Sequence, residues 1–247
     1  MDSVLDLFLW LIFPYIALTI FVVGHVWRYM YDKFGWTSRS SQMYERDILR
    51  WANPMFHFGI LAVFLGHVMG LGIPQSWTDA VGISEGMYHF MAISIGVIAG
   101  VFTIVGFIGL VYRRRFTKAV LGATTWMDKL MYLVLGVVIV LGLINTGSQV
   151  VGEYNYREGV SIWFRSIFYF NPEPGLMVSA PLSFQLHAFT AFALFALWPF
   201  TRLVHVFTAP LGYVFRPYVL YRTRDAHEGS RAHRRGWDKV DTIPRRR

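Results

Sequence analysis

Five long stretches of apolar residues, separated by short polar segments, dominate the pattern of hydrophobic and polar positions along the chain. A helix needs roughly 20 apolar residues to cross a hydrocarbon core of about 30 Å. The stretches cover residues 4–27, 52–72, 88–112, 130–150 and 182–208. The pattern therefore predicts an all-α integral membrane protein with five transmembrane helices.

The composition agrees with a membrane domain. Of the 247 residues, 55% are hydrophobic, 17% aromatic and only 15% charged, which lies outside the range of ordinary soluble domains. We predict one membrane domain over residues 1–212 and a basic tail over residues 213–247. The charge of the tail suits anionic lipid headgroups or an acidic partner surface, and a disordered tail would have the same composition.

The basic residues lie on one side of the predicted membrane. With an external N-terminus, residues 28–51, 113–129 and 202–247 lie inside and hold 5, 5 and 11 lysines and arginines, which is 21 of the 23. Because basic residues near helix ends are retained in the cytoplasm, we predict an extracytoplasmic N-terminus and a cytoplasmic C-terminus. Only Arg157 and Arg165 remain outside. This bias also accounts for the net charge of +8 without a nucleic-acid partner.

The sequence contains no cysteine but eight histidines. It therefore cannot ligate an iron–sulfur cluster through thiolates or attach a c-type haem covalently, and a bound metal must depend on histidine. Two histidines, His57 and His67, lie in the second apolar stretch, and His187 and His205 lie in the fifth. Ionisable residues inside a membrane are costly and are functional candidates by default.

The order of these four histidines predicts two pairs. The second helix enters from the cytoplasm, so His67 lies about 15 Å further out than His57 at 1.5 Å per residue. The fifth helix runs in the opposite direction, with His187 near the outer side and His205 about 27 Å further in. His67 should therefore meet His187, and His57 should meet His205. The unequal offsets require a tilt, or a bend at Pro199.

Haem b suits such pairs better than zinc does. Two imidazoles from facing helices can serve as the two axial ligands of a haem iron, whereas a structural zinc site requires four ligands. Hydrogen bonding across a helix interface is the simpler explanation for any single histidine, but two pairs on two helices favour metal binding. We therefore expect two haem b groups with all axial positions filled by protein, which suits electron transfer.

Small and basic residues accompany the histidines. Gly59 and Gly66 flank the histidines of the second helix and would leave room for a macrocycle, or would serve helix packing alone. Arg28 and Arg202 are candidate partners for haem propionates, with snorkelling towards the headgroups as the alternative.

Four sequence motifs resemble the gamma subunit of membrane-bound respiratory nitrate reductase. They are "FPYIA" at 13–17, "SSQM" at 40–43, "FHFGILAVFLGH" at 56–67 and "WPFTRLVHVFTAP" at 198–210. The resemblance extends over about residues 1–222 and leaves out the end of the tail.

The resemblance implies a dihaem cytochrome b of the cell membrane. Such a subunit oxidises quinol, either menaquinol or ubiquinol, near the extracytoplasmic face. It passes electrons to an iron–sulfur beta subunit on the cytoplasmic side, which feeds a molybdenum-containing alpha subunit; this chain would not reduce nitrate by itself. In the family, residues matching His67 and His187 hold the outer haem, and those matching His57 and His205 hold the inner one.

The resemblance also places a quinol site at Gly66 and His67, closed by the start of the third helix. Here the chain departs from the family pattern, because residues 84–90 read "SEGMYHF" and contain no lysine. His89 or Tyr88 could donate a hydrogen bond to a quinone carbonyl, and His89 or Glu85 could accept a proton. The alternative for His89 is an interfacial histidine that caps a helix end.

Two other functions fit parts of the pattern. A related membrane cytochrome serving a heterodisulfide or sulfite reductase would share the histidine geometry and differ only in its partner. A haem-free transporter or scaffold would use the histidines for proton handling or packing. Transport calls for acidic residues at mid-membrane, whereas the 15 carboxylates lie in loops or away from the centres of the spans.

Overall fold

The computed structural model describes residues 3–36, 40–152, 154–208 and 215, and these residues contain helices but no strand. Five helical segments are long and apolar enough to cross a membrane: Val4–Tyr31, Asp47–Gly72, Glu85–Phe116, Trp126–Val151 and Leu182–Phe200. The prediction of an all-α protein with five candidate spans is confirmed. The orientation of the termini stays a prediction.

The chain divides into two units, Met1–Thr208 and Ala209–Arg247. The first unit holds all the helices of the described residues, and only Phe215 of the second unit is described. The predicted boundary between residues 212 and 213, and all of the basic tail except Phe215, therefore lie outside the described residues.

Each span is built from one or more helical segments, and short helices join the spans. The α-helices are α1 (Val4–Leu7), α2 (Phe13–Tyr31), α3 (Asp47–His67), α4 (Gln75–Ala80), α5 (Glu85–Phe116), α6 (Lys118–Gly122), α7 (Trp126–Val151), α8 (Val160–Phe168), α9 (Pro174–Val178) and α10 (Leu182–Leu197). Two π-helices, η1 (Phe8–Ile12) and η3 (Val68–Gly72), and three 3₁₀-helices, η2 (Lys33–Gly35), η4 (Trp198–Phe200) and η5 (Arg202–Thr208), complete the set.

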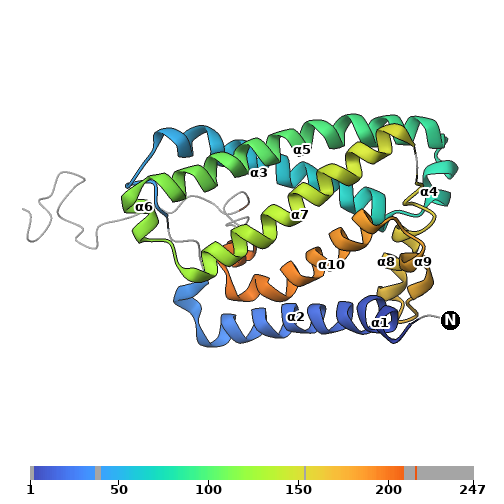
Figure 1. The fold of residues 1–247 in the computed structure, drawn as a ribbon, viewed down its shortest axis with the longest axis horizontal. Coiled ribbons are helices and arrows are strands. Elements are labelled where there is room, and N and C mark those ends of the chain that lie inside the picture. The colour runs from blue at the N-terminus through green and yellow to red at the C-terminus, as the bar shows by residue number, and fades with distance from the viewer. Residues whose placement is uncertain (1–2, 37–39, 153, 209–214, 216–247) are drawn as a thin grey trace, which may run out of the picture. The chain divides into compact units, whose positions relative to one another are not determined.

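The long helices of the first unit pack in a fixed order. Helix α3 packs along α5, α5 packs against α7, and α10 lies between α7 and α2. Figure 1 shows this order, with α4, α8 and α9 near the N-terminal end and α6 at the opposite end. Helices α3 and α10, which carry three of the four candidate histidines, are therefore not close packing neighbours along their lengths.

Glycines let α3 and α5 approach closely. A Cβ atom on Gly106 would lie 2.3 Å from the backbone nitrogen of Phe56, and one on Gly59 would lie 2.6 Å from the backbone nitrogen of Thr103. Real side chains do not fit at such distances, so these positions require glycine. Gly59 and Gly106 thus serve helix packing.

The fifth span does not continue as one helix to residue 208, because the chain breaks at Pro199, one of the two alternatives that the unequal histidine offsets required. Helix α10 ends at Leu197, and Thr201 is extended, with ψ 179°, between η4 and η5. The cause is Pro199, which lacks an N–H group and cannot continue the helical hydrogen bonds. The Arg28 guanidinium stabilises the break by donating hydrogen bonds to the carbonyls of Pro199 (2.6 Å) and Thr201 (3.0 Å).

The segment between the fourth and fifth spans folds into a cap, although its sequence gave no long apolar stretch. Its helices α8 and α9 pack on the nearby ends of the spans and share one apolar core with them. That core contains Trp10, Ala17, Val160, Trp163, Ile167, Met177, Ala180, Phe184 and Phe192. The indole nitrogen of Trp163 donates to the carbonyl of Trp10 at 2.9 Å, which ties the cap to the first span.

Candidate metal centre

The structure brings the four membrane histidines together in two pairs. The ring centroids of His57 and His205 lie 6.0 Å apart with an interplanar angle of 67°. Those of His67 and His187 also lie 6.0 Å apart, with an angle of 26°. These are the partners that the antiparallel order of the helices predicts. We call them the inner pair (His57 and His205) and the outer pair (His67 and His187), after the predicted sides of the membrane.

Each of the four histidines directs the same ring nitrogen at a backbone carbonyl. A carbonyl oxygen only accepts hydrogen bonds, so the geometry assigns the proton to Nδ1 and, in a neutral imidazole, leaves the lone pair on Nε2. The distances are 2.8 Å from His57 to Asn53, 2.8 Å from His67 to Val63, 3.1 Å from His187 to Val138 and 2.6 Å from His205 to Arg202. Metal-ligating histidines commonly have this arrangement, because the carbonyl fixes the tautomer and the ring orientation.

The ring separation fits a metal ion between each pair. Bonds from a metal to imidazole nitrogen are about 2.0–2.1 Å, and the ring centre lies roughly 1 Å beyond, so two rings on opposite sides of one ion have centroids about 6 Å apart. Among the residues that the structure describes, no group of three or more histidine, aspartate or glutamate side chains could hold a metal. A zinc site with three or four protein ligands is therefore not favoured, and two ligands per site fit the axial positions of haem.

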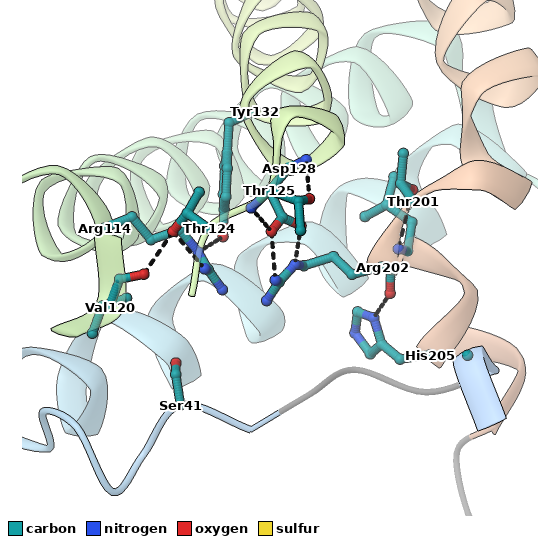
Figure 2. A network of polar contacts seen from close by, with 12 residues as sticks. Ser41, Arg114, Val120, Thr124, Thr125, Asp128, Tyr132, Thr201, Arg202 and His205 are labelled. Carbon is teal, nitrogen blue, oxygen red and sulfur yellow. Dashed lines mark hydrogen bonds and ion pairs between the residues drawn. The ribbon is translucent and has the colours of Figure 1, made fainter. Parts of the chain in front are cut away.

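A polar network holds the segment that carries His205. Arg202 donates two hydrogen bonds to the carboxylate of Asp128, at 2.7 and 2.9 Å, and its own carbonyl accepts the bond from His205 (Figure 2). Asp128 also forms a capping box with Thr125 at the start of α7. The broken end of the fifth span is thereby fastened to the N-terminus of α7.

The two candidate propionate partners are engaged within the protein. Arg28 donates to three backbone carbonyls, including that of Gly35 at 2.7 Å, and Arg202 pairs with Asp128. Both arginines therefore support the backbone around His205. A role for either in propionate binding stays a prediction.

The outer pair lies beside open space on one side and α7 on the other. Gly66 and His67 are exposed, and a Cβ atom on Gly66 would meet no heavy atom within 4 Å. A Cβ atom on Gly142 would lie 3.1 Å from Cε1 of His187. Glycine in α7 therefore lets this ring lie directly against the helix.

The candidate quinol-side residues of α5 have partners away from the outer pair. The ring nitrogen Nε2 of His89 donates to the carbonyl of Gln149 at 3.0 Å, in the last turn of α7. Glu85 forms an ion pair with Arg157 at 2.7 Å, and Tyr88 is buried beneath the same guanidinium. The helix-end role of His89 thus has a hydrogen bond in its favour, and its quinol role stays a prediction.

Tyr156 lies beside Tyr88, and its burial changes the pKa of its hydroxyl. The hydroxyls of Tyr156 and Tyr88 lie 3.4 Å apart. Burial, and then the neighbouring Tyr88 hydroxyl, raise the pKa of Tyr156 far above its usual value. Its hydroxyl therefore stays protonated and serves as a hydrogen-bonding group.

A second buried arginine organises the predicted cytoplasmic loop around residues 41–45. Arg113, whose side chain is 2% exposed, pairs with Glu45 and donates to the hydroxyl and carbonyl of Ser41. Partial burial pushes the pKa of Glu45 upward, but the N–H group of Ile48 and the Arg113 guanidinium outweigh this effect, and the net pKa is lowered. Glu45 is therefore held in its charged form.

Sequence reasoning missed several residues that support these sites. The pattern Thr125-x-x-Asp128 at the start of an apolar run is a capping signal that could have located the α7 end of the network. The contacts of Gly142 and Arg157 had no comparable signal, because they join positions far apart in the sequence. Such partners emerge only from the packing.

Comparison with known proteins gives a consistent result. A family model described as "Nitrate reductase gamma subunit" matches residues 6–224. The chain is 45% identical over 217 residues to the nitrate reductase gamma chain of Bacillus subtilis (strain 168), covering 87% of this chain and 97% of that protein. It is 35% identical over 231 residues to the respiratory nitrate reductase 2 gamma chain of Escherichia coli (strain K12), covering 91% and 100%.

A longer relative is also similar. The nitrate reductase-like protein NarX of Mycobacterium tuberculosis (strain ATCC 25618 / H37Rv) is 58% identical over 239 residues, which are 96% of this chain. The chain spans 36% of the length of that relative.

Proposed function

The chain belongs to the nitrate reductase gamma subunit family, and on that premise we propose that it is the quinol-oxidising, electron-transferring membrane subunit of a nitrate reductase. It binds one haem b at each histidine pair and resides in the cell membrane. The five candidate spans support a multi-pass membrane protein.

One observation carries the proposal. Four imidazoles form two pairs with centroids 6.0 Å apart, and all four hold their Nδ1 proton against a carbonyl. Each pair therefore offers two Nε2 lone pairs, which is the donor set of a bis-histidine haem. Bound haem supplies one-electron transfer, which the side chains of this protein cannot supply.

The outer pair is the proposed side of quinol oxidation. Gly66 and His67 are exposed, and a Cβ atom on Gly66 would meet no heavy atom within 4 Å, which would leave room for the haem that this pair holds and for a quinol head group beside it. Oxidation of one quinol gives two electrons and two protons, and release of the protons on the outer side contributes to a proton-motive force. The choice of menaquinol or ubiquinol depends on contacts with the quinol ring and tail.

The inner pair is the proposed exit for electrons. His205 lies in η5, beyond the end of the fifth candidate span at Phe200, so it is close to the end of the hydrophobic region. We propose that an iron–sulfur beta subunit receives electrons on this side and passes them to a molybdenum-containing alpha subunit. The chain contains no cysteine and so depends on such partners for iron–sulfur ligands.

Single substitutions of the four histidines test the pairing. We expect His67→Ala or His187→Ala to remove the outer haem and quinol oxidation, and His57→Ala or His205→Ala to remove only the inner haem, leaving about one haem per chain in each case. Haem content and the spectrum of the remaining haem are measured on purified, folded protein. Loss of the inner haem from a His67 variant would contradict the pairing. Normal haem binding with electron delivery to another reductase would contradict the nitrate reductase assignment.

A further inference from the structure

A buried arginine lies at the outer end of the helices, outside the groups used above. Arg157 is 4% exposed, and it is one of the two basic residues predicted on the extracytoplasmic side. Its Nη1 donates to Glu85 at 2.7 Å, its Nη2 donates to Thr78 at 2.9 Å, and its guanidinium lies 3.8 Å from the ring centre of Tyr88. We call these four residues the Arg157 clamp. The clamp joins α4, the start of α5 and the segment before α8.

The Arg157 clamp is continuous with the turn that follows His67. The hydroxyl of Tyr88 lies 3.4 Å from that of Tyr156, which in turn would lie 3.1 Å from a Cβ atom on Gly70. Gly70 belongs to the π-helix η3, which begins at the residue after His67. The clamp therefore reaches the outer pair through two tyrosines and one turn of backbone.

The cap holds the same π-helix by its carbonyl groups. Ser161 donates to the carbonyl of Gly70 at 2.7 Å, and Arg165 donates to that of Leu71 at 3.0 Å. Both arginines predicted on the outer side thus act on η3 or on the residues that pack against it. Short π-helices are rare and occur often at functional sites.

An ion pair with a buried guanidinium is a poor source of net stability but can select one arrangement of the chain. Burying a guanidinium costs several kcal/mol, and attraction to a carboxylate offsets this only with good geometry and further hydrogen bonds. Here Nε of Arg157 has no hydrogen-bond partner among the described residues, and Glu85 remains 40% exposed. The arrangement thus favours a role in fixing the geometry over one in overall stability.

We propose that Arg157, held by Thr78 and Glu85, is a positioning residue for the outer site: through Tyr88 and Tyr156 it fixes η3, and thereby the orientation of His67 and of the surface at Gly66. The inference rests on the proposed function in taking the outer pair as a haem and quinol site. It assigns Glu85 and Tyr88 to the clamp, and not to proton or quinol binding.

The test uses the full chain with haem and compares Arg157→Gln and Arg157→Lys with Glu158→Gln. Glu158 is the exposed neighbour of Arg157 and contacts Asn155, so its change removes one charge without touching the clamp. We expect Arg157→Gln to raise the KM for menadiol about tenfold, measured with an artificial one-electron acceptor that reoxidises the haems, and to alter the electron paramagnetic resonance signal of the outer haem, with the inner signal unchanged. Lysine keeps the charge but lacks the planar fork of arginine. Arg157→Lys should therefore raise the KM less than Arg157→Gln does, without restoring the value of the parent chain.

Two outcomes would overturn the inference: an outer signal and KM equal to those of the parent chain in folded Arg157→Gln, or equal changes at both haems. If this variant does not fold, Thr78→Val removes the hydroxyl that accepts from Arg157 and donates to the carbonyl of Gln75, and it should raise the KM in the same direction by about threefold. An unchanged KM in Thr78→Val would also contradict the proposal.

Hydrogen exchange separates this inference from the proposed function. The amides of residues 68–72 should exchange about tenfold faster in Arg157→Gln than in Glu158→Gln, whether or not haem is bound, because exchange reports local opening of the backbone. A parent chain without haem would contradict the proposed function alone. Equal exchange at residues 68–72 in the two variants would contradict the positioning role alone.

Discussion

Arg202 holds Asp128 through two hydrogen bonds, from Nε to Oδ1 at 2.7 Å and from Nη2 to Oδ2 at 2.9 Å. The pair joins the first turn of α7 to the residues that follow the break at Pro199. Because the carbonyl of Arg202 accepts the Nδ1 proton of His205, the pair also orients one member of the inner pair (Figure 2).

The first prediction concerns this ion pair. Asp128→Asn leaves Arg202 without its charged partner, and removal of one partner from a buried pair costs about 3–5 kcal/mol. Since the Arg202 side chain is 20% exposed, we expect the free energy of unfolding to fall by about 3 kcal/mol, as measured by denaturation in mixed micelles. The double variant Asp128→Asn, Arg202→Gln should regain part of this loss. Strictly additive losses would show that the two residues are not coupled.

The second prediction concerns the contact between α3 and α5. Gly106→Ala places a Cβ atom 2.3 Å from the backbone of Phe56, so the helices must separate, at a cost of about 1–3 kcal/mol. Gly147 is the matched control, since a Cβ atom there would meet nothing within 4 Å. Gly147→Ala should leave the free energy of unfolding unchanged or raise it by up to about 1 kcal/mol. Equal effects of the two substitutions would mean that α3 and α5 are not packed as described.

The third prediction concerns the two ring angles. Nearly parallel axial imidazole planes make the energies of the iron d orbitals differ more than nearly perpendicular planes do. With angles of 26° for the outer pair and 67° for the inner pair, the oxidised protein should give two low-spin resonance signals, and the inner haem should have the larger g anisotropy. His57→Ala should remove the more anisotropic signal. Its persistence in that variant would contradict the assignment.

The fourth prediction is a pH dependence at Glu45. Its pKa is lowered in the folded protein, so the charged carboxylate stabilises the fold above the ordinary pKa, and this contribution is lost as the pH falls through the folded pKa. Glu45→Gln should therefore lower Tm at neutral pH, and the difference from the parent chain should shrink as the pH falls below the ordinary glutamate pKa of 4.5. A difference of Tm that stayed constant into acid would have another cause.

Much of the fold was predictable because a bilayer imposes strict lengths and orientations. An apolar stretch of about 20 residues is long enough to cross the hydrocarbon core, so it predicts each span. The antiparallel order of the second and fifth spans then determines that His67 faces His187 and His57 faces His205. These relations depend on sequence order alone, which explains why the histidine pairs were found without a structure.

Other features depend on contacts between distant positions. The apolar stretch of the fifth span extends to residue 208, and a bend at Pro199 was one of two predicted alternatives, but the hydrogen bonds from Arg28 that hold the end at Phe200 had no signal in the sequence. Arg28 and Arg202 were candidate propionate partners, with snorkelling as the alternative, and a sequence cannot show that nearby carbonyls and Asp128 also bind them. The partners of Arg157 were invisible for the same reason.

The most direct test of the central claim is the dithionite-reduced minus oxidised absorption spectrum of the purified chain, with haem and protein quantified on one sample. Two bis-histidine sites predict about two b-type haems per chain. Folded protein that was made with haem available and contained none would contradict the account, and would leave the four histidines as helix-packing or proton-handling groups.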